Sequence, residues 1–374
     1  MTPRGLAFKT TLMASDTPSA ERTLLGARLR QRRIAVLGSI VIAFGFAWLL
    51  QAGALPVVPQ AHAFSGVRWW TVAVYTLVWF SILLLRSARW YLLLAPVERV
   101  TLRHTLAVGL IGYGAIALLP FRAGEAVRPA LIRKHGKLNL WAATGTVAAE
   151  RVIDGLVLSV ALVTALLFAR PLSPLPDRIG DLPIPAAAVR VAAWSASSMF
   201  GVLFLALVVF YHWRDFARRL TQRAVGTISP RAATRLADVV ERLADGLRFL
   251  PRWRYTGPFL ALTAAYWGLY LGTPWLLMWG SGLESVSVLD SVVVMGVLAL
   301  GFIVPNVPGF FGAFQISVYS GLVMFFPLAQ VTGPGSAFVF LLYLIQVGGT
   351  LIAGAMGLAL ESCCVKAPRP AVSS

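Results

Sequence analysis

The chain has 374 residues, of which 58% are hydrophobic and only 13% are charged. Soluble domains usually carry about 25% charged residues, so this composition excludes a soluble globular protein and indicates a polytopic membrane protein. The net charge of +18 is confined to short segments between apolar runs. That is the positive-inside pattern, and it argues against nucleic-acid binding.

Apolar windows of about 20 residues predict the membrane-spanning helices. After a basic N-terminal tail, residues 1–33, we expect a transmembrane domain over 34–361 and a short tail over 362–374. Six full spans are expected, at about 34–52, 68–85, 141–169, 188–211, 256–279 and 337–360. Between the fourth and fifth spans, residues 212–255 alternate arginines with apolar residues spaced three and four apart. This spacing favours an amphipathic helix on the membrane surface, with a solvated connector as the alternative.

Lysine and arginine gather in alternate connecting segments. Seven precede the first span, four lie in 86–103, five in 121–140, ten in 212–255 and two after residue 360. The segments 53–67, 280–287 and 327–336 have none. By the positive-inside rule, both termini are expected in the cytoplasm of a multi-pass protein of the inner or plasma membrane. The basic segments would also suit anionic lipids.

Two further apolar regions, 104–120 and 288–326, do not fit simple crossings. Basic, cytoplasmic segments flank 104–120, so this region is expected to enter from the cytoplasm and return. The segments around 288–326 are both external, so this region is expected to enter from outside and turn at PNVPG, 305–309. The prediction is an all-α fold of about six full spans and two re-entrant hairpins. This arrangement is similar to transporters whose broken helices meet near the midplane.

Three ionisable residues lie inside the predicted span 141–169. Glu150, Arg151 and Asp154 fall within an arc of about 100° and lie about 13 Å along the helix from Trp141. A charge at this depth costs roughly 2.5–3.5 kcal/mol, so the three side chains should face the protein interior. They either form an internal ion pair, Arg151 with Asp154, or serve the passage of a substrate or proton.

A second charged group follows the first hairpin region. Arg122 and Arg128 can present planar guanidinium forks to a phosphate, and Gly124 permits a close backbone approach. Glu125 is suited to hold an arginine or to meet a cationic headgroup. Arg128 precedes Pro129 and is expected to end a non-helical turn. The alternative is that these arginines only flank a cytoplasmic helix end.

The third candidate is the uncharged stretch GFIVPNVPGFFGAFQ, with Pro305, Pro308 and Gly309. A helix that restarts after Pro308 inside the membrane would offer free backbone N–H groups to an anion. The alternative is an ordinary tight turn. The chain shows no nucleophile elbow, Walker loop or metal-spaced histidine set. No catalytic residue, metal or cofactor is therefore expected, although an enzymatic role stays open.

Together these motifs resemble the transmembrane region of lysylphosphatidylglycerol synthases, also called the flippase-like domain family. The resemblance covers about residues 35–360 and rests on R-x-G-E-x-x-R at 122–128, E-R-x-x-D at 150–154 and P-x-x-P-G-x-x-G at 305–312. Where the family usually has a second glycine and a glutamate, this chain has Phe310 and Gln315.

The resemblance implies a translocator of a phospholipid or lipid-linked anionic molecule. The family's best-known members move aminoacylated phospholipid and carry a C-terminal synthase domain; this chain ends at Ser374, so we expect the membrane part alone. The expected partners are membrane lipids with anionic headgroups. The alternatives are a membrane-embedded transferase subunit and an accessory protein of a lipid-modifying complex. The expected substrate-binding residues are Arg122, Gly124, Glu125, Arg128, Glu150, Arg151, Asp154, Pro305, Pro308, Gly309 and Gln315.

Overall fold

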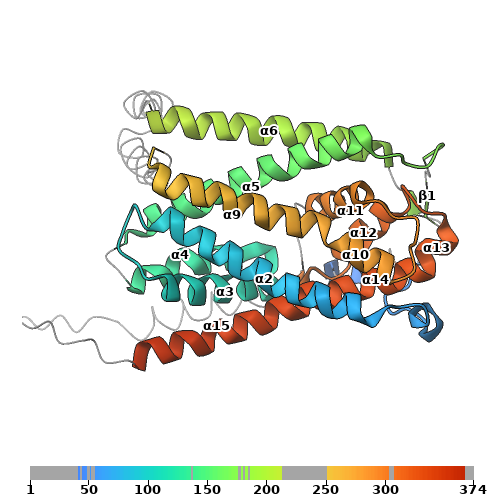
Figure 1. Cartoon of the computed structure of the whole chain (residues 1–374), viewed down its shortest axis with the longest axis horizontal. Helices are drawn as coiled ribbons and strands as arrows, with labels where there is room; N and C mark the ends of the chain where they lie inside the picture. Colours follow the sequence, from blue (N-terminus) through green and yellow to red (C-terminus); the bar gives the residue numbers. More distant parts are fainter. Residues whose placement is uncertain are drawn as a thin grey trace, which may run out of the picture.

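The protein is almost entirely helical in the residues that its computed structural model describes (Figure 1). These residues are 41–42, 44–48, 51, 55–135, 138–175, 178–179, 182–183, 186–212, 251–302 and 307–366. Within them, the one ladder pairs two-residue strands, β1 (Arg178–Ile179) antiparallel with β2 (Leu182–Pro183). The prediction of an all-α fold is confirmed.

The α-helices described after residue 51, in chain order, are α2 (Trp69–Leu94), α3 (Leu102–Leu118), α4 (Val127–Ile132), α5 (Leu140–Phe168), α6 (Ala186–His212), α9 (Trp253–Gly272), α10 (Pro274–Gly280), α11 (Val288–Gly301), α12 (Ala313–Leu322), α13 (Leu328–Thr332), α14 (Pro334–Tyr343) and α15 (Gly349–Lys366). A π-helical turn, Leu344–Gly348, joins α14 to α15. Short 3-10 helices are η1 (Ala61–Phe64), η2 (Pro120–Ala126), η3 (Arg133–His135) and η5 (Pro308–Phe310).

Four described helical stretches are long and apolar enough to cross a membrane. They belong to α2, α5, α6 and the continuous helix from α14 to α15. The 26 residues of α2 extend about 39 Å at 1.5 Å per residue, which exceeds the roughly 30 Å hydrocarbon layer of a bilayer. Helices α9 and α10 together form a fifth long element, broken where Pro274 begins α10. Of the predicted span 34–52, only residues 41–42, 44–48 and 51 are described, and all of them are helical. The N-terminal tail, residues 367–374 and most of segment 212–255 lie outside the described residues.

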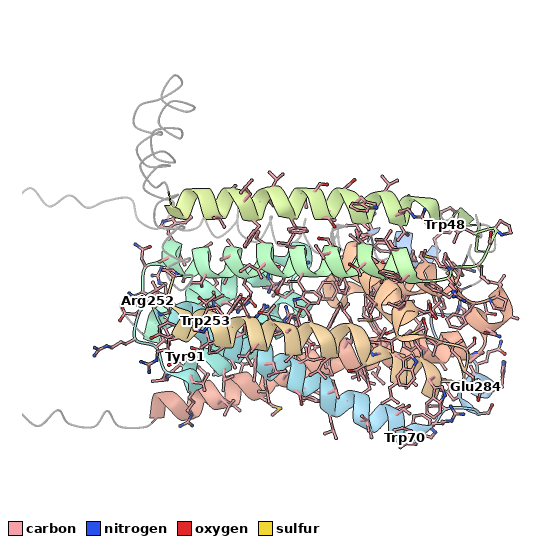
Figure 2. All side chains as sticks on the ribbon, turned by 45° about the horizontal axis from the view of Figure 1, so that its top comes forward. Trp48, Trp70, Tyr91, Arg252, Trp253 and Glu284 are labelled. Carbon is pink, nitrogen blue, oxygen red and sulfur yellow. The ribbon has the colours of Figure 1, made fainter. Side chains whose placement is uncertain are left out.

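The bundle has two ends, which labelled side chains identify. Tyr91, Arg252 and Trp253 lie at one end, called here the Arg252 end, whereas Trp70 and Glu284 lie at the other, the Glu284 end (Figure 2). Helices α2 and α15 finish at the Arg252 end, and α5 and α9 begin there (Figure 1). Arg252, from a segment predicted to be basic, and Glu284, from a segment predicted to be bare, thus lie at opposite ends of the bundle.

The two regions that did not fit simple crossings form opposed hairpins. Helix α3 starts at the Arg252 end and stops halfway, where η2 turns the chain and α4 returns (Figure 1). Helix α11 starts at the Glu284 end, and the chain turns through η5 into α12, which returns to that end. The tips meet where Arg122 Nη1 donates a hydrogen bond to the carbonyl of Phe302 at 3.3 Å.

Two predicted boundaries are wrong. Helix α2 continues nine residues past 85, to Leu94, so Arg86 and Arg89 lie inside a helix and not in a cytoplasmic loop. Buried carboxylate partners of Arg89 permit this continuation, as described below. Arg128 is helical within α4 and does not end a non-helical turn. Pro129 falls in the first turn of α4, where the backbone needs no N–H donor, and α4 can therefore begin before it.

Small residues bring the first hairpin close to the last helix. A Cβ atom on Gly114 of α3 would come within 3.0 Å of the Cα atom of Gly354 on α15. One turn on, a Cβ atom on Gly357 would come within 2.8 Å of the Ala107 carbonyl. Close backbone contact of this kind is how helices associate within a membrane, where the hydrophobic effect offers little drive. It fixes the position of the hairpin beside the charged residues.

Candidate functional site

A network of buried ion pairs joins α2 to α5. Arg89 on α2 donates hydrogen bonds to Glu150 Oε1 at 2.9 Å and to both carboxylate oxygens of Asp154 at 2.5 and 2.8 Å. The indole N–H of Trp267 on α9 donates to Asp154 Oδ1 at 3.1 Å. Arg89 and Glu150 are fully buried. The two carboxylates therefore face inward as predicted, but the partner of Asp154 is Arg89 and not Arg151.

Arg128 extends this network from α4. Its Nη2 atom lies 2.9 Å from Glu150 Oε2, at an angle outside hydrogen-bond geometry, so the contact is an ion pair. The guanidinium lies 4.2 Å from the centroid of the Trp90 ring. Its methylene stem rests on Gly112, where a Cβ atom would come within 2.1 Å of Arg128 Cγ. Arg128 is completely buried and acts as a counter-ion of Glu150.

Arg122 and Glu125 occupy the tip of the first hairpin. Arg122 Nε donates to Glu125 Oε1 at 2.9 Å, and Nη2 lies 2.6 Å from the same oxygen. Arg122 has a left-handed backbone with φ 55°, a strained conformation that non-glycine residues adopt mainly at constrained sites. Gly124 does permit a close backbone approach, but to α3: a Cβ atom there would meet Ala115 and Ile116 at 2.2 Å.

A cavity of about 430 Å³ lies between these groups and the tip of the second hairpin. Its charged lining residues are Arg86, Arg122, Glu125, Arg151 and Asp154. The aromatic lining residues are Trp79, Tyr113, Phe200, Tyr266, Trp267, Tyr270, Phe302, Phe310 and Phe314. A largely apolar cleft of this volume with a few convergent polar groups is typical of a small-molecule or headgroup site.

Arg151 stands apart from the paired arginines. It follows Glu150 on α5 and lines the cavity, yet its Nε and Nη2 atoms are buried without a hydrogen-bond partner among the described residues. Arg86 on α2 also lines the cavity, with its guanidinium 4.5 Å from the ring centroid of Tyr113 and 5.2 Å from that of Tyr266. Both cations line the cavity, and neither forms an ion pair with a carboxylate among the described residues.

The described proline and glycine residues of the third motif shape the second turn and do not line the cavity. Pro305 lies outside the described residues. Gly309 has a positive φ of 73°, and α12 begins at Ala313, not directly after Pro308. Gln315 accepts the backbone N–H of Gly312 at 2.7 Å, so its amide caps the helix. The described residues of this hairpin that line the cavity are Ala299, Leu300, Phe302, Phe310 and Phe314.

The predicted residues thus separate into three groups. Arg122, Glu125, Arg151 and Asp154 line one cavity; Arg128 and Glu150 lie buried beside it; Gly124, Pro308, Gly309 and Gln315 form backbone contacts and turns around it. The described residues contain no group of three His, Cys, Asp or Glu side chains placed to hold a metal. Of the three groups, the one that lines the cavity is placed to contact a ligand there.

Sequence reasoning missed Arg86 and Arg89. A signal for them exists in LLLRSARWYLLL, 83–94, where apolar residues continue on both sides of the arginines. The arginines are spaced i, i+3, so both lie on one helix face. An arginine pair inside an uninterrupted apolar run indicates intramembrane cations that need partners, not the end of a span.

Comparison with known proteins places this arrangement in a family. The family described as "Lysylphosphatidylglycerol synthase TM region" matches residues 36–354, a range that contains both hairpins and the ion-pair network. No curated protein and no solved structure matches the chain. With its long apolar helices, the protein is an integral, polytopic membrane protein. Because the match covers most of the chain, the protein belongs to the family of lysylphosphatidylglycerol synthase transmembrane regions.

Proposed function

We propose that the protein translocates a phospholipid, or a lipid-linked anionic molecule, by admitting its headgroup to the cavity between the two hairpins. The observation that carries this proposal is a cavity with five charged lining residues inside a bundle of apolar helices, at the meeting point of two hairpin tips. Irregular backbone at membrane depth occurs where it is enclosed by protein or lines a water-filled cavity, and such turns form the substrate sites of many transporters.

The charge of the site favours an anionic headgroup. The cavity and the adjoining network contain five arginines, Arg86, Arg89, Arg122, Arg128 and Arg151, and three carboxylates, Glu125, Glu150 and Asp154. This leaves a formal surplus of two positive charges. Buried charge without a counter-ion is costly, so an anion that enters the cavity lowers the electrostatic free energy of the site.

Access from the lipid phase is supported by α6. This helix packs against α5 and exposes large apolar side chains, among them Val191, Val202 and Leu205. Its Ala196 and Phe200 line the cavity, and a Cβ atom on Gly155 of α5 would come within 2.2 Å of the Phe200 ring. The cavity is therefore one helix away from lipid, so the acyl chains could stay in the bilayer while the headgroup enters.

The orientation of the protein is part of the same proposal. The exposed basic residues Arg99, Lys134 and Arg252 belong to segments at the Arg252 end, so by the positive-inside rule we expect this end in the cytoplasm of the inner or plasma membrane. One hairpin then opens toward the cytoplasm and the other toward the outside. Alternate opening of the two hairpins around the cavity would pass a headgroup between leaflets.

The test is a translocation assay in vesicles of neutral lipid. Purified protein is reconstituted with a fluorescent phosphatidylglycerol, and movement between leaflets is followed by quenching with an impermeant reductant. Arg151→Gln should lower the initial rate on the order of tenfold, because one charge-assisted hydrogen bond is lost. The matched control is Arg68→Gln, since Arg68 pairs with Glu284 away from the cavity. No movement with the wild type would refute the proposal; an unaffected Arg151→Gln would refute the site.

A further inference from the structure

Buried polar groups without partners gather on the cavity wall. Among the described residues, these groups include Trp79 Nε1, Arg86 Nε, Tyr113 Oη, and Arg151 Nε and Nη2. All four residues line the same cavity. Buried N–H and O–H groups are nearly always hydrogen-bonded in folded proteins, and each buried group without a hydrogen bond costs free energy. Their convergence on one cavity indicates that a ligand supplies their acceptors.

The unpartnered groups are donors. The indole N–H and the guanidinium groups can only donate, and a tyrosine hydroxyl can do either. Neither Arg86 nor Arg151 has a carboxylate within ion-pair distance among the described residues, unlike Arg89, Arg122 and Arg128. A ligand that hydrogen-bonds to these groups must therefore bring acceptor oxygens and negative charge.

The carboxylates of the site are already occupied. Asp154 accepts from Arg89 and Trp267; Glu125 is held by Arg122. Glu150 lies between Arg89 and Arg128 and does not line the cavity. Both described carboxylates on the cavity wall, Asp154 and Glu125, therefore already have an arginine partner. A cationic headgroup would have to compete with an arginine for its counter-ion.

We propose that the cavity selects a phosphodiester headgroup whose remaining part is an uncharged polyol, and discriminates against headgroups that carry an amine. The phosphate lies between Arg86 and Arg151, and hydroxyl oxygens of the polyol meet Trp79 and Tyr113. This inference rests on the proposed function only in attributing the headgroup to a lipid. The volume of about 430 Å³ lies in the range of sites for ligands of this class, roughly 300–1,000 Å³.

Binding, measured separately from translocation, tests the inference. Purified protein in detergent is titrated with short-chain phosphatidylglycerol and short-chain phosphatidylethanolamine; free glycerophosphoglycerol and inorganic phosphate serve as competitors. Phosphatidylglycerol should bind about tenfold more tightly than phosphatidylethanolamine. Glycerophosphoglycerol should compete, which would show that the headgroup is recognised, and inorganic phosphate should compete at least tenfold more weakly.

Two variants localise the effect. Arg86→Gln should weaken phosphatidylglycerol binding about tenfold and reduce the preference over phosphatidylethanolamine. Trp79→Phe keeps an aromatic side chain, although a smaller one, removes the indole donor and should weaken binding about fivefold. The controls are Arg68→Gln and Trp253→Phe, at residues outside the cavity, and size-exclusion profiles confirm folding. Both controls should bind as the wild type does.

The outcomes separate this inference from the proposed function. Equal or tighter binding of phosphatidylethanolamine, or inorganic phosphate competing as well as glycerophosphoglycerol, overturns the inferred selectivity. Folded Arg86→Gln and Trp79→Phe proteins with unchanged affinity overturn the inferred contacts. Selective binding without movement in vesicles overturns translocation and leaves the selectivity standing. Movement of lipid in vesicles without preferential binding of phosphatidylglycerol overturns the selectivity and leaves translocation standing.

Discussion

At the scale of single residues, Arg89 organises the charged interior. It bridges Glu150 and Asp154 with its two Nη groups, and its guanidinium lies 5.1 Å from the Tyr266 ring centroid. Arg89 pairs with both carboxylates, and Arg151 forms no ion pair among the described residues. The separation of paired and unpaired arginines depends on this one side chain.

Replacing Arg89 should therefore destabilise the protein strongly. Arg89→Ala leaves two buried carboxylates without their shared counter-ion, and breaking a buried pair from one side costs about 3–5 kcal/mol. Denaturant unfolding in detergent micelles measures the loss. The control is Arg99→Ala, since Arg99 is exposed at the Arg252 end. Equal stability of the two variants would show that Arg89 is not the main counter-ion.

The sequence predicted one half of this arrangement. The spacing of Glu150 and Asp154 on one helix face was enough to direct both carboxylates inward, because the period of a helix fixes relative direction. Their partner could not be found this way. Arg89 lies 61 residues from Glu150 in the chain, and charge counting assigned it to a cytoplasmic segment. Helix packing decides which arginine pairs with which carboxylate, and helical periodicity does not predict helix packing.

At the scale of elements, charge asymmetry predicted the hairpins better than hydropathy did. Helix α3 is 17 residues long and apolar, and by length it is close to a spanning helix. The basic segments on both of its sides required a return, and η2 with α4 provides it. The turns themselves depend on backbone detail, such as the positive φ of Arg122 and Gly309, that residue patterns indicate only through proline and glycine.

The contact between α3 and α15 gives a prediction for helix packing. Gly114→Leu should separate the two helices, because its Cβ atom would already lie 3.0 Å from Gly354 Cα. Overpacking of this kind costs about 1–3 kcal/mol, and a thermal scan in detergent should show a lower Tm. Gly268→Leu on α9 is the matched control, since a Cβ atom there meets nothing within 4 Å. Equal Tm values for the two variants would contradict the close packing.

At the scale of the whole molecule, two half-depth hairpins from opposite ends enclose one cavity. The first brings Arg122 and Glu125 to its wall; the second brings Phe302 and Phe310. The contact between Arg122 and the Phe302 carbonyl closes the gap between the tips. A movement of either hairpin would break this contact and alter access to the cavity from its own end, which is the property that alternating access requires.

The opposed hairpins predict which positions share a side of the membrane. Single cysteines are introduced at four exposed positions after Cys363 and Cys364 are replaced by serine: Arg99 and Lys134 flank the first hairpin, and Glu284 and Gln330 flank the second. An impermeant maleimide applied to intact cells should label Glu284→Cys and Gln330→Cys. It should label Arg99→Cys and Lys134→Cys only after the membrane is permeabilised, because the positive-inside rule puts the Arg252 end in the cytoplasm. If both pairs reverse, the orientation is wrong and the hairpins stand. If Arg99→Cys and Lys134→Cys label from different sides, α3 is a full crossing, and the enclosed cavity on which translocation depends does not exist in the membrane.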